Sequence, residues 1–151
     1  MTVVERIQSV DSLGPGTAAY VRETMTLTWE ERRQGHGRRQ TDGGLAFGVS
    51  LAPGAVLKEG DCLVLAPERT IVVVAEARER VYVIRAATSR DWAFYAYHVG
   101  NRHQPLDVTE HGLVVPHSAA VRSLLDQLRA TYVEDVRPFN AILAASGHSH
   151  P

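Results

Sequence analysis

Residues 88–103 read Thr-Ser-Arg-Asp-Trp-Ala-Phe-Tyr-Ala-Tyr-His-Val-Gly-Asn-Arg-His, and this stretch decides the fold of the second half of the chain. Thr88 and Asp91 have the spacing of a capping box, in which a hydroxyl and a carboxylate satisfy the free backbone donors of the first helical turn. Apolar residues then recur on one helical face at Trp92, Tyr95, Ala96 and Val99. The pattern predicts a helix that ends at Gly100-Asn101, because both residue types tolerate the left-handed conformation.

Strands are predicted on both sides of this helix. Before it, the apolar runs 71–74 and 81–84 are typical of strands, either as one long strand or as two strands that flank a boundary. After it, short strand candidates at 106–108 and 113–115 surround a turn at His111-Gly112. The helix is therefore expected to pack on a sheet.

A second helix and a last strand complete the pattern. Ser118 can cap the helix, whose apolar residues have the spacing i, i+3, i+4, i+7. These residues are Val121, Leu124, Leu125 and Leu128. Residues 132–136 are typical of a strand. The elements then follow the order βαββαβ, which is the ferredoxin-like arrangement.

The first half of the chain has a different pattern. Up to Leu65, apolar and polar residues alternate with period two, as in 24–29 and 45–51. Turn signals separate the alternating segments at about ten-residue intervals. They are Asp42-Gly43-Gly44, Pro53-Gly54 and Gly60-Asp61. This half is predicted to be a small all-β domain without helices.

We therefore predict an α+β protein with two domains and a tail. Residues 1–74 form the small all-β domain, and residues 75–146 form the ferredoxin-like (βαββαβ) domain. Residues 147–151 are a flexible tail that carries His148 and His150.

The charge balance gives no general attraction to nucleic acid or to membranes. The chain has 16 Lys and Arg against 17 Asp and Glu. No run approaches the roughly 18 to 20 apolar residues of a membrane span, and the N-terminus lacks the pattern of a secretion signal. We expect a cytoplasmic protein, with neither nucleic acid nor membrane among its partners.

Motifs of known catalytic sites are missing, so we expect no enzyme. The sequence has no Gly-x-Ser-x-Gly elbow, His-Glu-x-x-His pair or Walker loop. Its single cysteine, Cys62, lies in an apolar strand and is expected to pack as a small hydrophobic residue. One cysteine also excludes an internal disulfide and a thiolate cage. A metal site must therefore rest on imidazole, carboxylate and water.

Two histidines border the predicted helix end. His98 and His103 are five residues apart, which separates them by about 140° around a continuous helix, so they cannot chelate one ion together. Beyond the Gly100-Asn101 turn, His103 is free to point outward. Two copies of His103 on a two-fold axis make a workable metal site. The alternative is a surface histidine bonded to a backbone carbonyl. For His98 the alternatives are a metal ligand or a histidine favoured by the negative helix end.

The tail histidines are further candidates. His148 and His150 alternate with Ser149, so in an extended tail both rings can bind one ion. The alternative is a disordered terminus, or a remnant of a cloned tag.

The other histidines each have a functional and a simpler interpretation. His117 precedes the second helix and His111 lies in a predicted hairpin turn, so each is a secondary ligand or a solvated loop residue. His36 lies between two arginine pairs in the run 32–39, which indicates either a phosphate or partner patch or a solvated loop.

Residues 97–103, Tyr-His-Val-Gly-Asn-Arg-His, resemble the Tyr-His-Leu-Gly-Asn-Arg-His signature of the UreE family, the nickel metallochaperones of urease maturation. Residues 38–43 and 57–63 also resemble segments of this family. So do the second helix, Arg137-Pro138-Phe139 and the histidine-bearing end. The resemblance covers nearly the whole chain.

The resemblance implies an N-terminal β domain that binds protein partners or peptides, and a C-terminal domain that dimerises and holds nickel at its interface. His103 of each subunit would be the interfacial ligand, and His148 or His150 would be tail ligands. His117 falls where some members have an additional metal-binding histidine, and His98 also matches the signature. The short tail departs from members with long histidine-rich ends, so the resemblance implies delivery of nickel rather than storage.

The predicted function is that of a homodimer that passes Ni²⁺ to the urease apoprotein. The implied partners are the accessory GTPase UreG and the urease apoprotein with its other accessory proteins. Imidazole also suits Zn²⁺ and Cu²⁺, so both are expected to bind the same residues. The alternative is a ferredoxin-like interaction or RNA-binding module, in which Trp92, Tyr95 and Tyr97 stack on bases.

Overall fold

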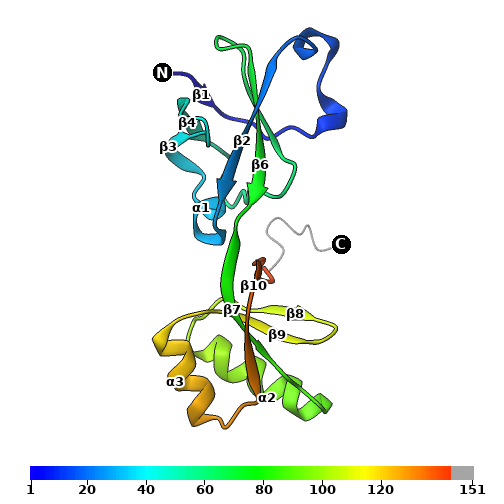
Figure 1. The fold of residues 1–151 in the computed structure, drawn as a ribbon, viewed down its shortest axis with the longest axis vertical. Helices are drawn as coiled ribbons and strands as arrows, with labels where there is room; N and C mark the ends of the chain where they lie inside the picture. Colours follow the sequence, from blue (N-terminus) through cyan, green and yellow to red (C-terminus); the bar gives the residue numbers. More distant parts are fainter. Residues whose placement is uncertain (144–151) are drawn as a thin grey trace. The chain divides into compact units, whose positions relative to one another are not determined.

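The chain divides into two compact units, Met1–Ala77 and Arg78–Pro151, in a computed structural model that describes residues 1–143 (Figure 1). The division falls shortly after the predicted boundary at residue 74, because strand β6 (Thr70–Glu76) continues past it and β7 (Arg78–Ile84) begins directly after Ala77. His148 and His150 lie outside the described residues. No helix within residues 1–143 is long and apolar enough to cross a membrane.

The first unit contains two three-stranded sheets. One has the order β1 (Val3–Val4), β4 (Ala46–Ser50), β3 (His36–Gln40), and the other has the order β2 (Val21–Leu27), β6, β5 (Cys62–Leu65). Two short 3₁₀ helices, η1 (Val10–Ser12) and η2 (Pro15–Thr17), precede β2. Apolar residues from both sheets form one buried cluster, which includes Met25, Phe47 and Val72. The predicted alternation thus marks real strands.

The prediction that this half has no helix is wrong. Residues 24–29 were expected to form a strand, but β2 ends at Leu27 and helix α1 (Trp29–Arg33) follows. The Thr28 hydroxyl accepts a hydrogen bond from the Glu31 backbone N–H, and the Glu31 carboxylate accepts one from the Thr28 N–H at 2.7 Å. This capping box stabilises the start of a helix, so the strand does not continue through Trp29 as the period-two pattern predicted.

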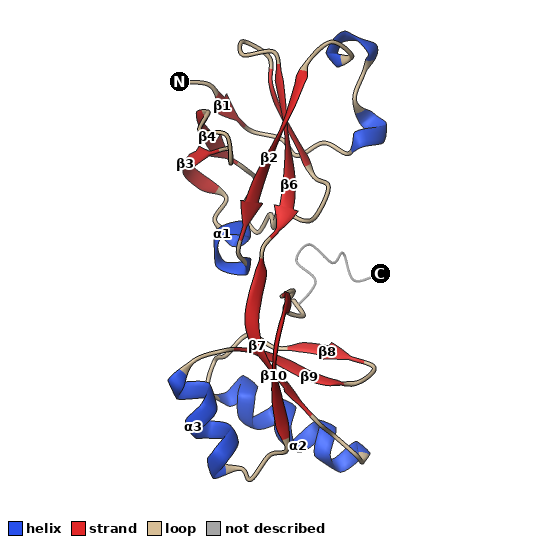
Figure 2. Cartoon of the chain, in the orientation of Figure 1, coloured by secondary structure: helices blue, strands red, loops and turns tan. Residues whose placement is uncertain are grey.

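The second unit places two helices against one four-stranded sheet (Figure 2). Its elements are β7, α2 (Ser89–Asn101), β8 (Asp107–Thr109), β9 (Gly112–Pro116), α3 (Ala119–Gln127) and β10 (Tyr132–Pro138). The strand order is β10-β7-β9-β8 and all neighbours are antiparallel. Tyr82, Ile84, Leu113 and Val115 of the sheet share one core with Val99 of α2 and with Val121, Leu124 and Leu125 of α3. The chain is therefore an α+β protein built mostly from sheets, as predicted.

Candidate metal centre

His103 is the left-handed residue that terminates helix α2. We predicted that Gly100-Asn101 would take this conformation, but α2 continues through Asn101 and His103 has φ 57°. The His103 N–H donates to the Gly100 carbonyl at 2.9 Å, and the Gln104 N–H donates to the Val99 carbonyl at 3.3 Å. These two bonds define a Schellman motif with His103 at the position that usually holds glycine. The prediction was wrong because glycine tolerates the left-handed state without requiring it.

This position gives His103 an exposed imidazole on a fixed backbone. The residue is exposed, as predicted, and its backbone is held by the helix end. A side chain at positive φ costs about 1 kcal/mol relative to glycine, and such strain is often found at functional positions. Among residues 1–143, no three His, Cys, Asp or Glu side chains gather to hold a metal ion. The described part of one chain therefore supplies at most an incomplete site at His103.

His98 lies in the last turn of α2, as predicted, among aromatic rings. Its imidazole packs edge-on against Phe94, with ring centroids 4.6 Å apart, and against Tyr97, at 5.2 Å. The side chain is half-buried, whereas Tyr97 is 66% exposed. Phe94 and Tyr97 lie outside the apolar stripe of α2 that faces the core. We define Phe94, Tyr97 and His98 as the outer face of α2. This face was not predicted, although residues 92–97 contain more aromatic residues than one buried stripe needs.

The RNA-binding alternative loses two of its three stacking residues. Trp92 and Tyr95 pack against the core between the helices and the sheet, so their faces are not presented together to a base. Tyr97 alone of the three points into solvent.

His117 has a defined set of side-chain partners. Its ring stacks on Tyr82, with centroids 4.8 Å apart and an interplanar angle of 24°. Its Nε2 lies 3.2 Å from Oε1 of Glu134, whose other carboxylate oxygen lies 3.7 Å from the Arg80 guanidinium. The backbone N–H of His117 also donates to the Arg80 carbonyl at 3.1 Å. Before Nε2 could bind a metal ion, it would have to leave Glu134.

The two remaining described histidines lie on turns and edges. His111 is exposed in the β8–β9 turn, where its backbone N–H donates to Thr109 Oγ1 at 3.3 Å. His36 is exposed at the start of β3, and its Nδ1 lies 3.4 Å from the Ser50 hydroxyl. The interpretation of His36 as a loop residue is therefore wrong, because residues 36–40 pair with β4.

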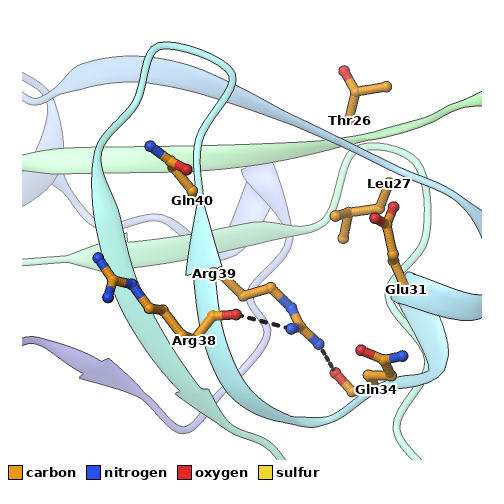
Figure 3. A pocket seen from close by; sticks show the side chains of 7 residues that line it. All are labelled: Thr26, Leu27, Glu31, Gln34, Arg38, Arg39 and Gln40. Carbon is orange, nitrogen blue, oxygen red and sulfur yellow. Dashed lines mark hydrogen bonds between the residues drawn. The ribbon is translucent and has the colours of Figure 1, made fainter.

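The arginine run 32–39 does not form one cationic patch. Arg32 is fully buried and lies 3.5 Å from Glu76, and Arg33 lies 3.7 Å from Glu30. Arg38 and Arg39 line a groove of about 430 Å³ together with Thr26, Leu27, Glu31, Gln34 and Gln40 (Figure 3). Arg39 donates to the backbone carbonyls of Arg38, at 3.0 Å, and of Gln34. The groove is polar, with two guanidinium groups and one carboxylate.

These features define a class of protein: a two-unit α+β chain with an exposed histidine fixed at a helix end and no closed metal site among residues 1–143. Its two halves match two family models. Residues 3–76 match "UreE urease accessory protein, N-terminal domain", and residues 79–151 match "UreE urease accessory protein, C-terminal domain". The chain belongs to the UreE urease accessory protein family.

Relatives in several bacteria support this assignment. The urease accessory protein UreE of Nostoc punctiforme is 32% identical over 136 residues, which cover 90% of this chain and 92% of the relative. The UreE protein of Bordetella pertussis is 36% identical over 135 residues, which cover 83% of this chain and 63% of the relative. A similar match, at 36% identity, is to a bifunctional urease accessory protein UreEF of Bordetella bronchiseptica, of which this chain covers 30%.

Proposed function

We propose that this protein is a nickel carrier of urease maturation, in which His103 from each of two subunits binds one Ni²⁺. The observation that carries the proposal is the exposed His103 imidazole on the rigid, left-handed end of α2. Because one imidazole is a poor divalent site, a second copy related by a two-fold axis is the simplest completion. Membership of the UreE urease accessory family supports nickel as the cargo. We infer no catalytic role.

We assign the second unit to the ferredoxin-like class. Its elements run strand, helix, strand, strand, helix, strand, and the sheet order β10-β7-β9-β8 places the first and third strands in the centre. Both observations agree with a split βαβ arrangement. The assignment makes residues from 78 onward the metal-binding and dimerisation domain.

The outer face of α2 is the surface that we propose for the dimer contact. It presents Phe94 and the exposed ring of Tyr97 on the helix that His103 terminates. In an isologous contact each residue approaches its own mate or a neighbour of that mate. Pairing two α2 helices near their C-terminal ends therefore brings the two His103 side chains together while it covers Tyr97, an aromatic residue of the kind enriched at interfaces.

Further ligands complete the metal shell in this proposal. His148 and His150 are the tail ligands, and His117 and His98 have lesser roles because each already packs against other side chains. Zn²⁺ and Cu²⁺ suit the same imidazoles, so selectivity for nickel must come from the partners. An incomplete, exposed site also favours release by ligand exchange.

The first unit serves partner docking in this proposal, through the groove that Arg38 and Arg39 line. Its guanidinium groups suit an acidic segment of a partner protein. The proposed partners are UreG and the urease apoprotein with its other accessory proteins, in the cytoplasm. The relative named UreEF supports an association with another accessory protein.

The test is to titrate the unchanged dimer and a His103→Gly variant with nickel and to compare the number of tightly bound ions. Glycine removes the imidazole and tolerates φ 57°, so the helix end should stay intact. His111→Ala is the matched control, because His111 is also exposed and belongs to the same unit. We expect His103→Gly to lose one tightly bound nickel per dimer and His111→Ala to retain it. An unchanged stoichiometry in His103→Gly would contradict the proposal.

A further inference from the structure

Strand β3 is the outer strand of its sheet, and it lines the polar groove of the first unit (Figure 3). In an antiparallel pair, every second residue directs its backbone N–H and carbonyl toward the neighbouring strand, and the others direct theirs away from it. Beside the ends of β3, the Leu51 N–H donates to the Gly35 carbonyl at 2.7 Å, and the Thr41 N–H donates to the Leu45 carbonyl at 2.9 Å. The odd-numbered residues of β3 therefore face β4, and the even-numbered residues face outward.

The outward N–H groups of Arg38 and Gln40 are free donors. Both residues line the groove, and neither N–H has a hydrogen bond to any residue in the range 1–143 that the structure describes. Gly48 lies opposite Arg38, and its N–H donates to the Thr2 carbonyl at 2.8 Å, on the side of β4 that faces away from β3. This bond agrees with an outward N–H at Arg38. An edge strand with free donors is a template for the addition of another strand.

At two other sheet edges, side chains occupy the outward groups. On β10, the Val136 N–H donates to Asp135 Oδ1 at 2.8 Å, and the Arg78 guanidinium donates to the Val136 carbonyl at 2.8 Å. On β2, the Thr26 N–H donates to Asp42 Oδ1 at 2.9 Å, and this bond, with a second from the Thr26 hydroxyl, holds the pKa of Asp42 below its usual value. Charged side chains at an edge oppose strand addition. In the described part of the chain, no side chain accepts the outward donors of β3 in this way, so they are available to an incoming strand.

The charges of the groove favour an acidic occupant. Arg38 is exposed, and the Arg39 guanidinium donates to the carbonyls of Arg38, at 3.0 Å, and of Gln34 (Figure 3). The Nε of Arg39 is buried and makes no hydrogen bond within the described residues. Glu31 supplies a carboxylate to the groove, but this carboxylate already accepts the Thr28 N–H at 2.7 Å. Two free N–H groups and two guanidinium groups suit backbone carbonyls and carboxylates.

We propose that an extended, acidic segment of a partner protein pairs with the outward edge of β3 as an added strand. Its backbone carbonyls accept the N–H groups of Arg38 and Gln40, which are about 7 Å apart along the strand. Its carboxylates pair with the guanidinium groups of Arg38 and Arg39. The inference rests on the proposed function, which assigns partner docking to this groove, and it adds the mode of recognition: backbone pairing with alternate residues of β3.

Amide hydrogen exchange of the full dimer, with and without a partner, tests this pairing. The probes are purified UreG and the urease apoprotein with its other accessory proteins, each added separately. In the free dimer, the Arg38 and Gln40 amides should exchange quickly, whereas the Arg39 amide, which faces β4, should exchange slowly. A partner in excess over its Kd should slow exchange at Arg38 and Gln40 at least about tenfold and leave Arg39 unchanged. Docking through side chains alone would leave all three amides as they were.

Gln40→Pro is the second test, with Gln40→Ala as the matched control. Proline lacks the outward N–H and alanine keeps it, while both variants lose the bond from Gln40 Nε2 to the Gly44 carbonyl at 3.1 Å. Proline is tolerated on an edge strand where the missing N–H faces outward, so β3 should still pair with β4. We expect Gln40→Pro to bind the partner about fivefold more weakly than Gln40→Ala, as the loss of one hydrogen bond implies.

The proposal is overturned if Gln40→Pro binds the partner as tightly as Gln40→Ala, or if the bound partner leaves exchange at Arg38 and Gln40 unchanged. If Gln40→Pro does not fold, the exchange measurement decides, because it uses the unchanged chain. Failure of the proposed function gives a different result: neither probe would bind the unchanged dimer, and the inference would fall with the docking role. A partner that binds without protecting these amides overturns the inference alone.

Discussion

His103 and His117 belong to the same unit, but their surroundings differ completely. His117 is stacked on Tyr82 and bonded to Glu134, whereas the imidazole of His103 has no hydrogen bond or ion pair within the part of the chain that the structure describes. The backbone of His103 is the more strained of the two, because it has a positive φ. The difference indicates that the His117 side chain contributes to the fold, and it leaves the His103 imidazole available for the external ligand that we propose.

The largest effect expected from this comparison is on nickel affinity. Replacing His103 with glycine removes one direct ligand from each subunit, and we expect the tightest affinity to fall at least about 100-fold. His117→Ala should reduce it by no more than about threefold, because His117 is already engaged with Glu134. Isothermal titration of both variants measures the ratio. Equal losses for the two variants would remove the distinction between the histidines.

The free energy of unfolding should show the opposite ranking. His117→Ala loses the stacking on Tyr82 and the bond to Glu134, which together contribute about 1 kcal/mol, given the partial exposure of the pair. Urea denaturation, with the transition of the second unit followed separately, gives the value. A cost near zero would mean that the His117 contacts do not stabilise the fold.

His103→Gly should stabilise the same unit. Glycine takes φ 57° without the penalty of a side chain, so we expect a gain of up to about 1 kcal/mol. His103→Ala is the control, because it removes the imidazole but keeps a Cβ at positive φ, and it should not be stabilised. Thermal unfolding of the two metal-free variants compares them directly. A less stable glycine variant would show that the imidazole has a structural role.

The smallest effect concerns the partner of His117. Glu134→Gln removes the carboxylate charge beside Nε2, so His117 becomes more available to metal. We expect the weaker nickel-binding events to strengthen about twofold, while the tightest one stays unchanged. The same substitution in a His117→Ala background should have no effect on metal. Nickel titration to high concentration measures both.

Much of the second unit was predictable because its signals are local. The Thr88–Asp91 capping box sets the start of α2, and Ser118 caps α3, as the spacing indicated. The same type of local signal at Thr28 and Glu31 was overlooked because it lies inside a period-two pattern. Exposure of His103 followed correctly from a helix end near residue 101, although the left-handed residue was assigned wrongly.

Other features depend on contacts between distant residues and have no local signal. The stretch that follows β10 is held by the hydrogen bond between the Ile142 N–H and the Leu106 carbonyl and by the burial of Phe139. The contact between His117 and Glu134 depends on β10 lying beside β7. Neither follows from periodicity, because both require the strand order of the finished sheet.

The most direct test of the central claim uses a mixed dimer in which one subunit carries His103→Gly and the other is unchanged. Two different affinity tags separate this species from the parent dimers, and its tight nickel stoichiometry is then measured by titration. We predict that one missing imidazole removes the shared site, so the mixed dimer binds no nickel tightly while the unchanged dimer binds one ion. The opposite result is a mixed dimer that binds nickel with full affinity at half the stoichiometry of the unchanged dimer. This result would contradict the shared site, because each His103 would then bind metal without its mate.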